Sequence, residues 1–430
     1  MIQPMAELHC IAKRGWLKKK HFPGPFCISA SMTSHGARST ALGAGWKRCW
    51  QDSGMNKLSR LLGRALLLFA MLPLTASAQD LKPVTVVRGL DNAWALTFLP
   101  DGRMLVTEKT GRLRIVEQDG TLGQPLANLP PVDNTGQCGL LDVAVDPQFA
   151  QNRLIYWTFA EPAAAASGQS GNSTAVARGR LGPDDKLTEV RIIFVQQPKV
   201  ASRLHCGSRI AFARDGTLWV GLGDRFERKE DAQVGTNHLG KIIRIDRDGK
   251  SPADNPFAGA NARAGMATEI FSLGHRNIQG LASHPVTGDL WETEHGPQGG
   301  DEINRIEAGQ NYGWPRVTYG RNYGSGTRIG EEGPKAGFEH PLKWWVPSVA
   351  PSGLAFVTSD RYPGWKGNVI MGTLRGQVLI RLTLNGNQVV GEERLLQTLG
   401  ARIRDVRQGP DGYLYLVTDG NDGRVIRLER

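Results

Sequence analysis

The feature that most constrains the fold of this 430-residue chain is a strand–turn–strand pattern that recurs along its length. Each copy joins one alternating apolar run to another through a Pro-Asp-Gly turn or an equivalent turn rich in Gly or Asp. The copies lie at residues 95–106, 141–157, 210–220, 280–291, 353–371 and 405–416.

Six copies at a roughly regular spacing favour the radial repetition of small antiparallel sheets. Many copies are followed by a further strand-like run, as at residues 112–116 and 241–245. We therefore predict an all-β fold, a six-bladed β-propeller of four-stranded antiparallel blades that spans residues 79–430 as one domain. Loops at the mouth of its central channel are where function is expected, because the fold itself specifies no chemistry.

The first 78 residues differ in character from the rest. Residues 1–54 show no sustained apolar period, and we expect a disordered extension. Residues 55–78 begin at Met55 with a basic lead, continue with an apolar run and end in Ala-Ser-Ala, which predicts a secretory signal peptide cleaved near Ala78. Its apolar run is short for a membrane span, so no stable membrane insertion is expected.

The net charge of +11 belongs mostly to this leader. Residues 1–78 carry 11 of the 52 Lys and Arg residues but only 2 of the 41 Asp and Glu residues, so the remainder is nearly neutral. A nucleic-acid partner is therefore not expected. Two cysteines, Cys138 and Cys206, lie in the exported part, where they form either one disulfide or two buried thiols.

Histidine and acidic side chains at two blade entrances suggest acid–base chemistry. His205 precedes one strand of the third copy and Asp224 follows the next, so both can face a shared hollow. A His beside a carboxylate suits a general base, although a turn histidine with a solvated aspartate is the commoner explanation.

Other blade entrances carry polar groups that suit an anionic ligand. Gln137 lies between glycines, and Arg276-Asn277 precedes a core strand. Arg402 and Arg404 lie on one face of a strand, which makes a clamp for a multiply charged anion or a solvated strand face. The stretch from Glu294 to Asn304 is rich in Gly, Pro and carboxylates, which suits calcium but lacks the spacing of an EF-hand. No Gly-rich loop opens a helix, so a Rossmann-type cofactor site is not expected.

From about Val84 to Leu428 the chain closely resembles the soluble quinoprotein glucose dehydrogenases, and most closely their periplasmic aldose sugar dehydrogenase branch. The motifs that carry the resemblance are Gly136-Gln137-x-Gly139-Leu140, His205-x-x-x-Arg209, Gly223-Asp224, Gly274-x-Arg276-Asn277-x-Gln279-Gly280, Glu294-x-Gly296-Pro297-x-x-x-Asp301-Glu302-Ile303-Asn304, Asn311-Tyr312-Gly313-Trp314-Pro315 and Arg402-x-Arg404-Asp405.

This resemblance implies an enzyme that binds pyrroloquinoline quinone (PQQ) and calcium and oxidises the anomeric hydroxyl of aldoses to lactones. His205 matches the catalytic base, Asp224 the group that orients it and Gln137 a substrate ligand. Arg276 matches a residue with both a catalytic and a cofactor-binding role. The resemblance further implies cofactor contacts by Asn277, Arg375, Arg402 and Arg404, calcium binding by main-chain oxygens of Gly296 and Pro297, and a second, structural calcium at Glu302 and Tyr312.

Two departures from the family pattern affect these expectations. Leu204 replaces an acidic residue that precedes the catalytic histidine in the glucose dehydrogenases, so a preference for glucose does not carry over. Arg375 replaces a lysine near PQQ, which keeps the charge but changes the geometry. Independently of the family, Cys138 follows Gln137 and Cys206 follows His205, so we predict that the two cysteines lie close together, and a disulfide between them would join the two loops.

The remaining expectations concern location and partners. The signal peptide and the resemblance imply a periplasmic or secreted monomer or homodimer that passes electrons to an acceptor not identified by the sequence. The alternatives are a calcium-dependent propeller lactonase or hydrolase, which would have no use for the arginine clamp, and a propeller that binds a protein or glycan without catalysis.

Overall fold

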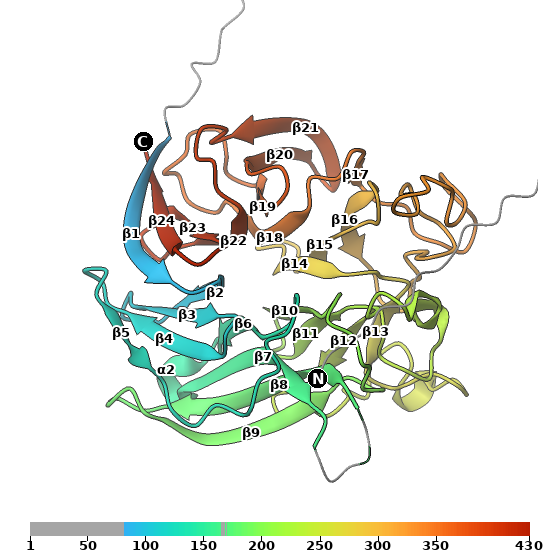
Figure 1. The fold of residues 1–430 in the computed structure, drawn as a ribbon, viewed down its shortest axis with the longest axis horizontal. Coiled ribbons are helices and arrows are strands. Elements are labelled where there is room, and N and C mark those ends of the chain that lie inside the picture. The colour runs from blue at the N-terminus through green and yellow to red at the C-terminus, as the bar shows by residue number, and fades with distance from the viewer. Residues whose placement is uncertain (1–80, 165–167, 169) are drawn as a thin grey trace, which may run out of the picture. The chain divides into compact units, whose positions relative to one another are not determined.

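The computed structural model describes residues 81–164, 168 and 170–430, which form a ring of six four-stranded antiparallel sheets (Figure 1). The predicted six-bladed β-propeller is confirmed. The predicted extension and signal peptide lie outside the described residues. Among the described residues, no helix has the length and apolar character that crossing a bilayer would require.

Blades 1 to 3 follow one another in sequence, each running from the channel outward. Blade 1 contains β2 (Ala93–Phe98), β3 (Met104–Glu108), β4 (Arg112–Val116) and β5 (Leu122–Pro125). Blade 2 contains β6 (Leu140–Val145), β7 (Leu154–Pro162), β8 (Asn172–Leu181) and β9 (Leu187–Val195). Blade 3 contains β10 (Gly207–Phe212), β11 (Leu218–Leu222), β12 (Lys241–Ile245) and β13 (Ile270–Leu273).

Blades 4 and 5 repeat this order. Short helices lie in the connections of blades 2 and 3. Blade 4 contains β14 (Ile278–Ser283), β15 (Leu290–Glu294), β16 (Asp301–Ile306) and β17 (Lys343–Trp345). Blade 5 contains β18 (Pro351–Phe356), β19 (Val369–Thr373), β20 (Leu379–Asn385) and β21 (Gln388–Leu395). The short helices are α2 (Phe149–Asn152) and the 3-10 helices η3 (Lys229–Gln233) and η4 (Gly259–Asn261).

Blade 6 closes the ring with strands from both ends of the described chain. It contains β22 (Ile403–Gln408), β23 (Leu414–Thr418), β24 (Gly423–Glu429) and, on its outer edge, β1 (Lys82–Leu90). β1 pairs antiparallel with β24, from Lys82 opposite Glu429 to Leu90 opposite Gly423. This closure was not predicted from the sequence. It completes the sixth sheet with strands from both ends of the described chain, so the ring closes without a gap between them.

The hydrophobic core lies between neighbouring blades. Tyr156 and Val176 of blade 2 pack in one cluster with Val220 and Ile243 of blade 3, and similar clusters join other neighbours. Each such side chain contributes about 1.5–3 kcal/mol when it is fully buried. The alternation of apolar residues in each strand follows from this arrangement, since each sheet presents one face to each neighbour.

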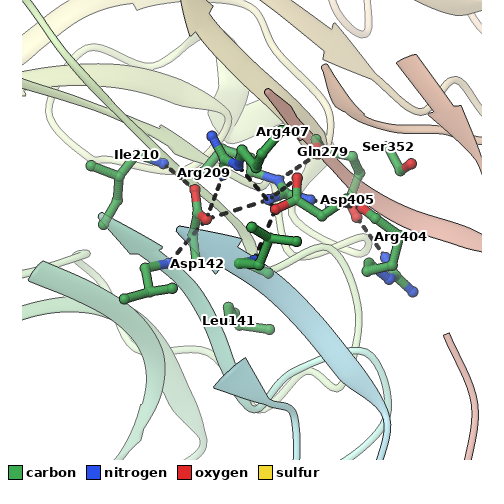
Figure 2. A network of polar contacts seen from close by, with 12 residues as sticks. Leu141, Asp142, Arg209, Ile210, Gln279, Ser352, Arg404, Asp405 and Arg407 are labelled. Carbon is green, nitrogen blue, oxygen red and sulfur yellow. Dashed lines mark hydrogen bonds and ion pairs between the residues drawn. The ribbon is translucent and has the colours of Figure 1, made fainter. Parts of the chain in front are cut away.

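A buried ion network links inner strands of different blades (Figure 2). Arg209 of β10 forms ion pairs with Asp142 of β6 and, at 2.8 Å, with Asp405 of β22. Arg407 binds the same two carboxylates at 2.9 and 3.0 Å. Arg209 also donates to the main-chain oxygens of Gln279 and Arg404, at 2.7 and 2.9 Å. One guanidinium group therefore joins the inner strands of four blades.

Candidate active site

A cavity of about 310 Å³ lies at one end of the channel, and we call it the channel cavity. Its walls come from the residues just before the inner strands: Asn92, Gln137, Cys206, Asn277, Ala350 and Arg402. Residues that directly follow four of the second strands complete it: Lys109, His295, Leu374 and Asp419. An antiparallel hairpin begins its first strand and ends its second at the same edge, so the fold brings all of these residues together.

A second pocket of about 320 Å³ lies beside His205, and we call it the mouth pocket. Arg276, Phe226 and Trp314 also line it. His205 lines the mouth pocket while its neighbour Cys206 lines the channel cavity, so the two hollows meet at the same loop.

His205 and Asp224 form the predicted pair. His205 Nδ1 lies 2.6 Å from Asp224 Oδ1, and both side chains are almost fully buried. Because an ionised carboxylate only accepts, this contact places the ring proton on Nδ1 and leaves Nε2 with a free lone pair. His205 has a φ of 51°, an uncommon conformation for a residue other than glycine. Such strain persists only where surrounding contacts fix it, as at active sites.

Two groups that sequence reasoning missed hold Asp224 in place. The indole Nε1 of Trp314 donates to Asp224 Oδ2 at 2.7 Å, and the main-chain N–H of Phe226 donates to Oδ1 at 2.8 Å. The ring of Phe226 contacts the imidazole of His205 edge-on, at 5.1 Å between centroids. Trp314 belongs to the motif Asn311-Tyr312-Gly313-Trp314-Pro315, but its contact with blade 3 depends on the path of the loop after β16, which the sequence does not reveal.

The surroundings keep His205 neutral. Burial is the main cause that lowers its pKa below the usual value of 6.5, and the positive charge of Arg276 lowers the pKa further. The hydrogen bond and charge of Asp224 oppose this shift. The result is an unprotonated imidazole at neutral pH, the form that a general base requires.

Gln137 lies beside the base, as predicted. Its Oε1 accepts a hydrogen bond from the main-chain N–H of His205 at 3.0 Å, and Gln137 N–H donates to Arg203 O at 2.8 Å. Cys138 and Cys206 lie close together, as predicted, with 5.7 Å between their Cα atoms, and of the two alternatives left open by the sequence the structure shows the disulfide. The loop of Gln137 is therefore joined to the loop of His205 both covalently and by hydrogen bonds.

The guanidinium group of Arg225 caps this disulfide, and the sequence did not indicate it. Its Nη1 lies 2.9 Å from Cys206 Sγ and 3.7 Å from Cys138 Sγ. Nη2 donates to Asn172 and to Ser202 O. Burial lowers the pKa of Arg225 to about 10, so the group stays cationic beside the base.

Positive charge dominates the wall of the channel cavity. Arg402 and Arg404 both bind Asp419, at 3.0 and 2.9 Å. Lys109 lies on the same wall, and its ammonium donates to the main-chain oxygens of Asn134 and Gly136 at 3.1 and 3.0 Å. The residues that line this cavity therefore include three cations and a single carboxylate.

Arg276 and Asn277, the predicted cofactor contacts, each border one of the two hollows. Arg276 lines the mouth pocket and Asn277 the channel cavity. Asn277 Oδ1 accepts from Gly207 N–H and from Gln279, both at 3.2 Å. Arg276 Nη1 donates to the main-chain oxygens of His295 and Gly296, at 2.8 and 2.7 Å.

The remaining predicted residues are Pro297 and Arg375. Pro297 lines the mouth pocket. Arg375 is exposed, with its main-chain N–H bonded to Val349 O at 3.2 Å, and it is its neighbour Leu374 that lines the channel cavity.

The predicted structural calcium pair, Glu302 and Tyr312, lines a third, small pocket together with Glu294 and Gly296. The hydroxyl of Tyr312 donates to Arg305 O at 2.7 Å and accepts from Glu307 N–H at 2.8 Å. Since that hydroxyl is engaged, the main-chain oxygen of Tyr312 is the atom left for a cation.

Comparison with known proteins identifies the family. The sequence profile of the Glucose / Sorbosone dehydrogenase family matches residues 90–427. The aldose sugar dehydrogenase YliI of Escherichia coli K12 is 43% identical over 343 residues, which cover 79% of this chain and 90% of the relative.

Two solved structures share the fold over nearly their full length. The apo-form of the soluble aldose sugar dehydrogenase from Escherichia coli is 40% identical, with a TM-score of 0.77 over 81% of this chain and 99% of that one. The PQQ-bound aldose sugar dehydrogenase from Streptomyces coelicolor is 30% identical, with a TM-score of 0.67 over 81% and 98%. The chain therefore belongs to the glucose/sorbosone dehydrogenase family, within which its motifs group it with the quinoprotein aldose sugar dehydrogenases.

Proposed function

We propose that this protein is a PQQ- and calcium-dependent aldose sugar dehydrogenase that oxidises the anomeric hydroxyl of an aldose to a lactone. The observation that carries the proposal is a neutral, buried imidazole that lines the mouth pocket, one residue away from a channel cavity whose wall carries surplus positive charge. A lactonase or hydrolase would not need that charge, and a simple binding protein would not need the oriented base.

The residues of the channel cavity fit PQQ, a flat quinone that bears carboxylates. Arg402, Arg404 and Lys109 face it with Asp419 as their one acidic partner. The side chain of Arg404 is 13% exposed, and its Nε has no hydrogen-bond partner among the described residues. An arriving carboxylate would provide the acceptor that this N–H lacks.

The calcium expected beside PQQ also fits, with one adjustment. Gly296 O and Pro297 would supply main-chain oxygens, the ligands that calcium prefers. Gly296 O already accepts from Arg276. A carbonyl oxygen has two lone pairs, so it can accept this bond and bind a cation as well.

The chain's own residues perform the proton chemistry. His205 Nε2 accepts the proton of the anomeric hydroxyl, and Asp224 stabilises the imidazolium that forms. Trp314 and the Phe226 amide keep the Asp224 carboxylate in position during this transfer. Gln137 is placed to bind the sugar, and Arg276 contributes positive charge where negative charge develops. Bound PQQ supplies the acceptor for the hydride that leaves the anomeric carbon.

Reconstitution tests the proposal. Purified protein would be loaded with PQQ and calcium and offered several aldoses with a redox dye, and in parallel a sugar lactone without dye. We expect dye reduction that requires both PQQ and an aldose and that stops after calcium removal. Lactone hydrolysis without PQQ would favour the hydrolase, and absence of both activities and of PQQ binding would leave a binding propeller.

We further propose that the protein is exported through residues 55–78 and acts as a periplasmic or secreted monomer or homodimer. The basic lead, apolar run and Ala-Ser-Ala pattern support this. N-terminal sequencing of the exported protein should give a start just after Ala78, and an intact leader on the active protein would contradict it.

A further inference from the structure

A second group of ionisable side chains lies buried in blade 4, away from the base. In the antiparallel pair of β15 and β16, Glu292 lies opposite Asn304 and Glu294 opposite Glu302. Residues opposite each other in such a pair share a face of the sheet. That face packs toward blade 3, because Leu290 on the same strand face belongs to a cluster with residues of that blade.

Three carboxylates here have no Lys or Arg partner within the described residues. Glu292, Glu294 and Glu302 are all buried, and in the described part of the chain none of them forms an ion pair with a Lys or Arg side chain. Their nearest cationic candidate is His275, whose Nδ1 lies 3.7 Å from Glu294 Oε1, beyond hydrogen-bond length. Buried charges are normally paired or bound to metal ions.

Three polar atoms of this group also lack hydrogen-bond partners within the described residues. They are His275 Nδ1, Glu292 Oε2 and Asn304 Oδ1, on side chains that are at most 1% exposed. The other atoms are engaged: His275 Nε2 contacts Ser272 Oγ at 2.8 Å, and Asn304 Nδ2 donates to Glu292 Oε1 at 2.8 Å. The ligand atoms of His275, Glu292 and Glu294 lie within 4.8 Å of one another.

Protonation does not account for this arrangement. A proton on Glu292 would remove one charge, yet the described structure offers no acceptor to Oε2 and no donor to Asn304 Oδ1. Protonation therefore still leaves the amide oxygen of Asn304, which can only accept a hydrogen bond, without a donor. A cation satisfies lone pairs on nitrogen and oxygen at once and offsets the carboxylate charge.

We propose that His275, Glu292 and Glu294 bind a divalent cation, with Asn304 Oδ1 as a further oxygen ligand. The imidazole nitrogen makes Zn²⁺ or Mn²⁺ a better match than Ca²⁺, which takes oxygen ligands. None of these ligands belongs to the expected calcium pair, Glu302 and Tyr312, but Glu294 lines the same small pocket as that pair, so the proposed cation is an immediate neighbour of the expected structural calcium.

The site would also support the cofactor loop. Glu294 Oε2 accepts the main-chain N–H groups of Arg276 and, at 3.3 Å, Asn277. A cation bound to Oε1 would hold the Glu294 carboxylate in place. Through Oε2 it would also fix the main chain of these two residues, without contacting substrate or PQQ.

Metal titration tests the proposal. The full protein, stripped with chelator and then saturated with calcium to fill the calcium sites, would be titrated with ZnCl₂ and with MnCl₂ by calorimetry. We expect one tight equivalent per chain for at least one of the two metals. Glu292→Gln should weaken it by more than about 100-fold, since changes to groups outside the ligand shell already cost 10- to 100-fold.

Glu108→Gln is the matched control. Glu108 ends the corresponding strand of blade 1 and is equally buried, but it is paired with Arg112 at 2.6 Å, so this variant should keep the equivalent. If Glu292→Gln does not fold, X-ray absorption of the metal-loaded wild type replaces it and should show a nitrogen donor. No tight equivalent in calcium-saturated protein, equal binding by Glu292→Gln, or an all-oxygen shell would each overturn the proposal.

Discussion

The ion network between the inner strands and the channel cavity are both rich in arginine, yet their charge balance differs. In the network, Arg209 and Arg407 face Asp142 and Asp405, so charges match one for one. The cavity wall carries Arg402, Arg404 and Lys109 against the single carboxylate of Asp419, which pairs with the two arginines. The balanced group links inner strands of different blades, whereas the unbalanced one lacks an anion, which is why we assign the ligand to the cavity.

The largest effect is expected outside both regions and separates turnover from binding. His205→Ala removes the proton acceptor and should lower kcat by about 100- to 10,000-fold, while PQQ affinity stays nearly unchanged. Steady-state kinetics of the PQQ-loaded variant and a PQQ titration measure the two quantities. A variant that keeps most of its rate would show that His205 is not the base.

Arg209→Met tests whether the balanced network is structural. Removing one partner leaves Asp142 and Asp405 under-compensated, which should lower the free energy of unfolding by about 3–5 kcal/mol. Chemical denaturation monitored by tryptophan fluorescence measures it. An unchanged midpoint would break the comparison, since the network would then contribute nothing to stability.

Arg404→Met makes the corresponding change in the cavity. Losing a charge-assisted hydrogen bond of about 1.5–3 kcal/mol should weaken PQQ binding by roughly 10- to 100-fold. Stability should change much less than in Arg209→Met, because Arg402 still pairs with Asp419. If Arg404→Met instead unfolds the protein and the folded fraction binds PQQ normally, the two regions do not differ as described.

The pH dependence offers a smaller test of the base. Since burial and Arg276 lower the pKa of His205, the neutral form persists below the usual value of about 6.5. The acid limb of kcat/KM should therefore lie below pH 6.5, with activity lost only as pH falls further. Unfolded chains take up this proton near 6.5, so His205 also lowers native stability below that pH. An acid limb above 6.5 would point to a different group.

The smallest effect is expected at Arg375. Because the side chain is exposed, Arg375→Lys should change PQQ affinity by less than about fivefold, within the 0–1 kcal/mol typical of exposed charges. A PQQ titration beside Arg404→Met measures it. A loss as large as that of Arg404→Met would mean that the loop of Arg375 closes over the ligand.

The local pattern of the chain was sufficient to predict the blades, because each strand–turn–strand unit is encoded within a few dozen residues. The pairing of β1 with β24 was not predictable in this way, since it joins residues more than 300 positions apart. His205 and Asp224 were found from spacing and family motifs. The contact of Trp314 with Asp224 depends on the path of a long loop of blade 4, which the sequence does not specify. In the sequence Glu292 is an ordinary strand residue, and only the structure shows that its Oε2 has no hydrogen-bond partner among the described residues.

A crystal structure of the protein with PQQ and calcium bound tests the central claim most directly. We expect the quinone in the channel cavity, its carboxylates on Arg402 and Arg404, and space beside His205 Nε2 for a sugar hydroxyl at hydrogen-bond distance. PQQ bound at any other place, or in the cavity but beyond reach of a sugar held by His205, would contradict the account.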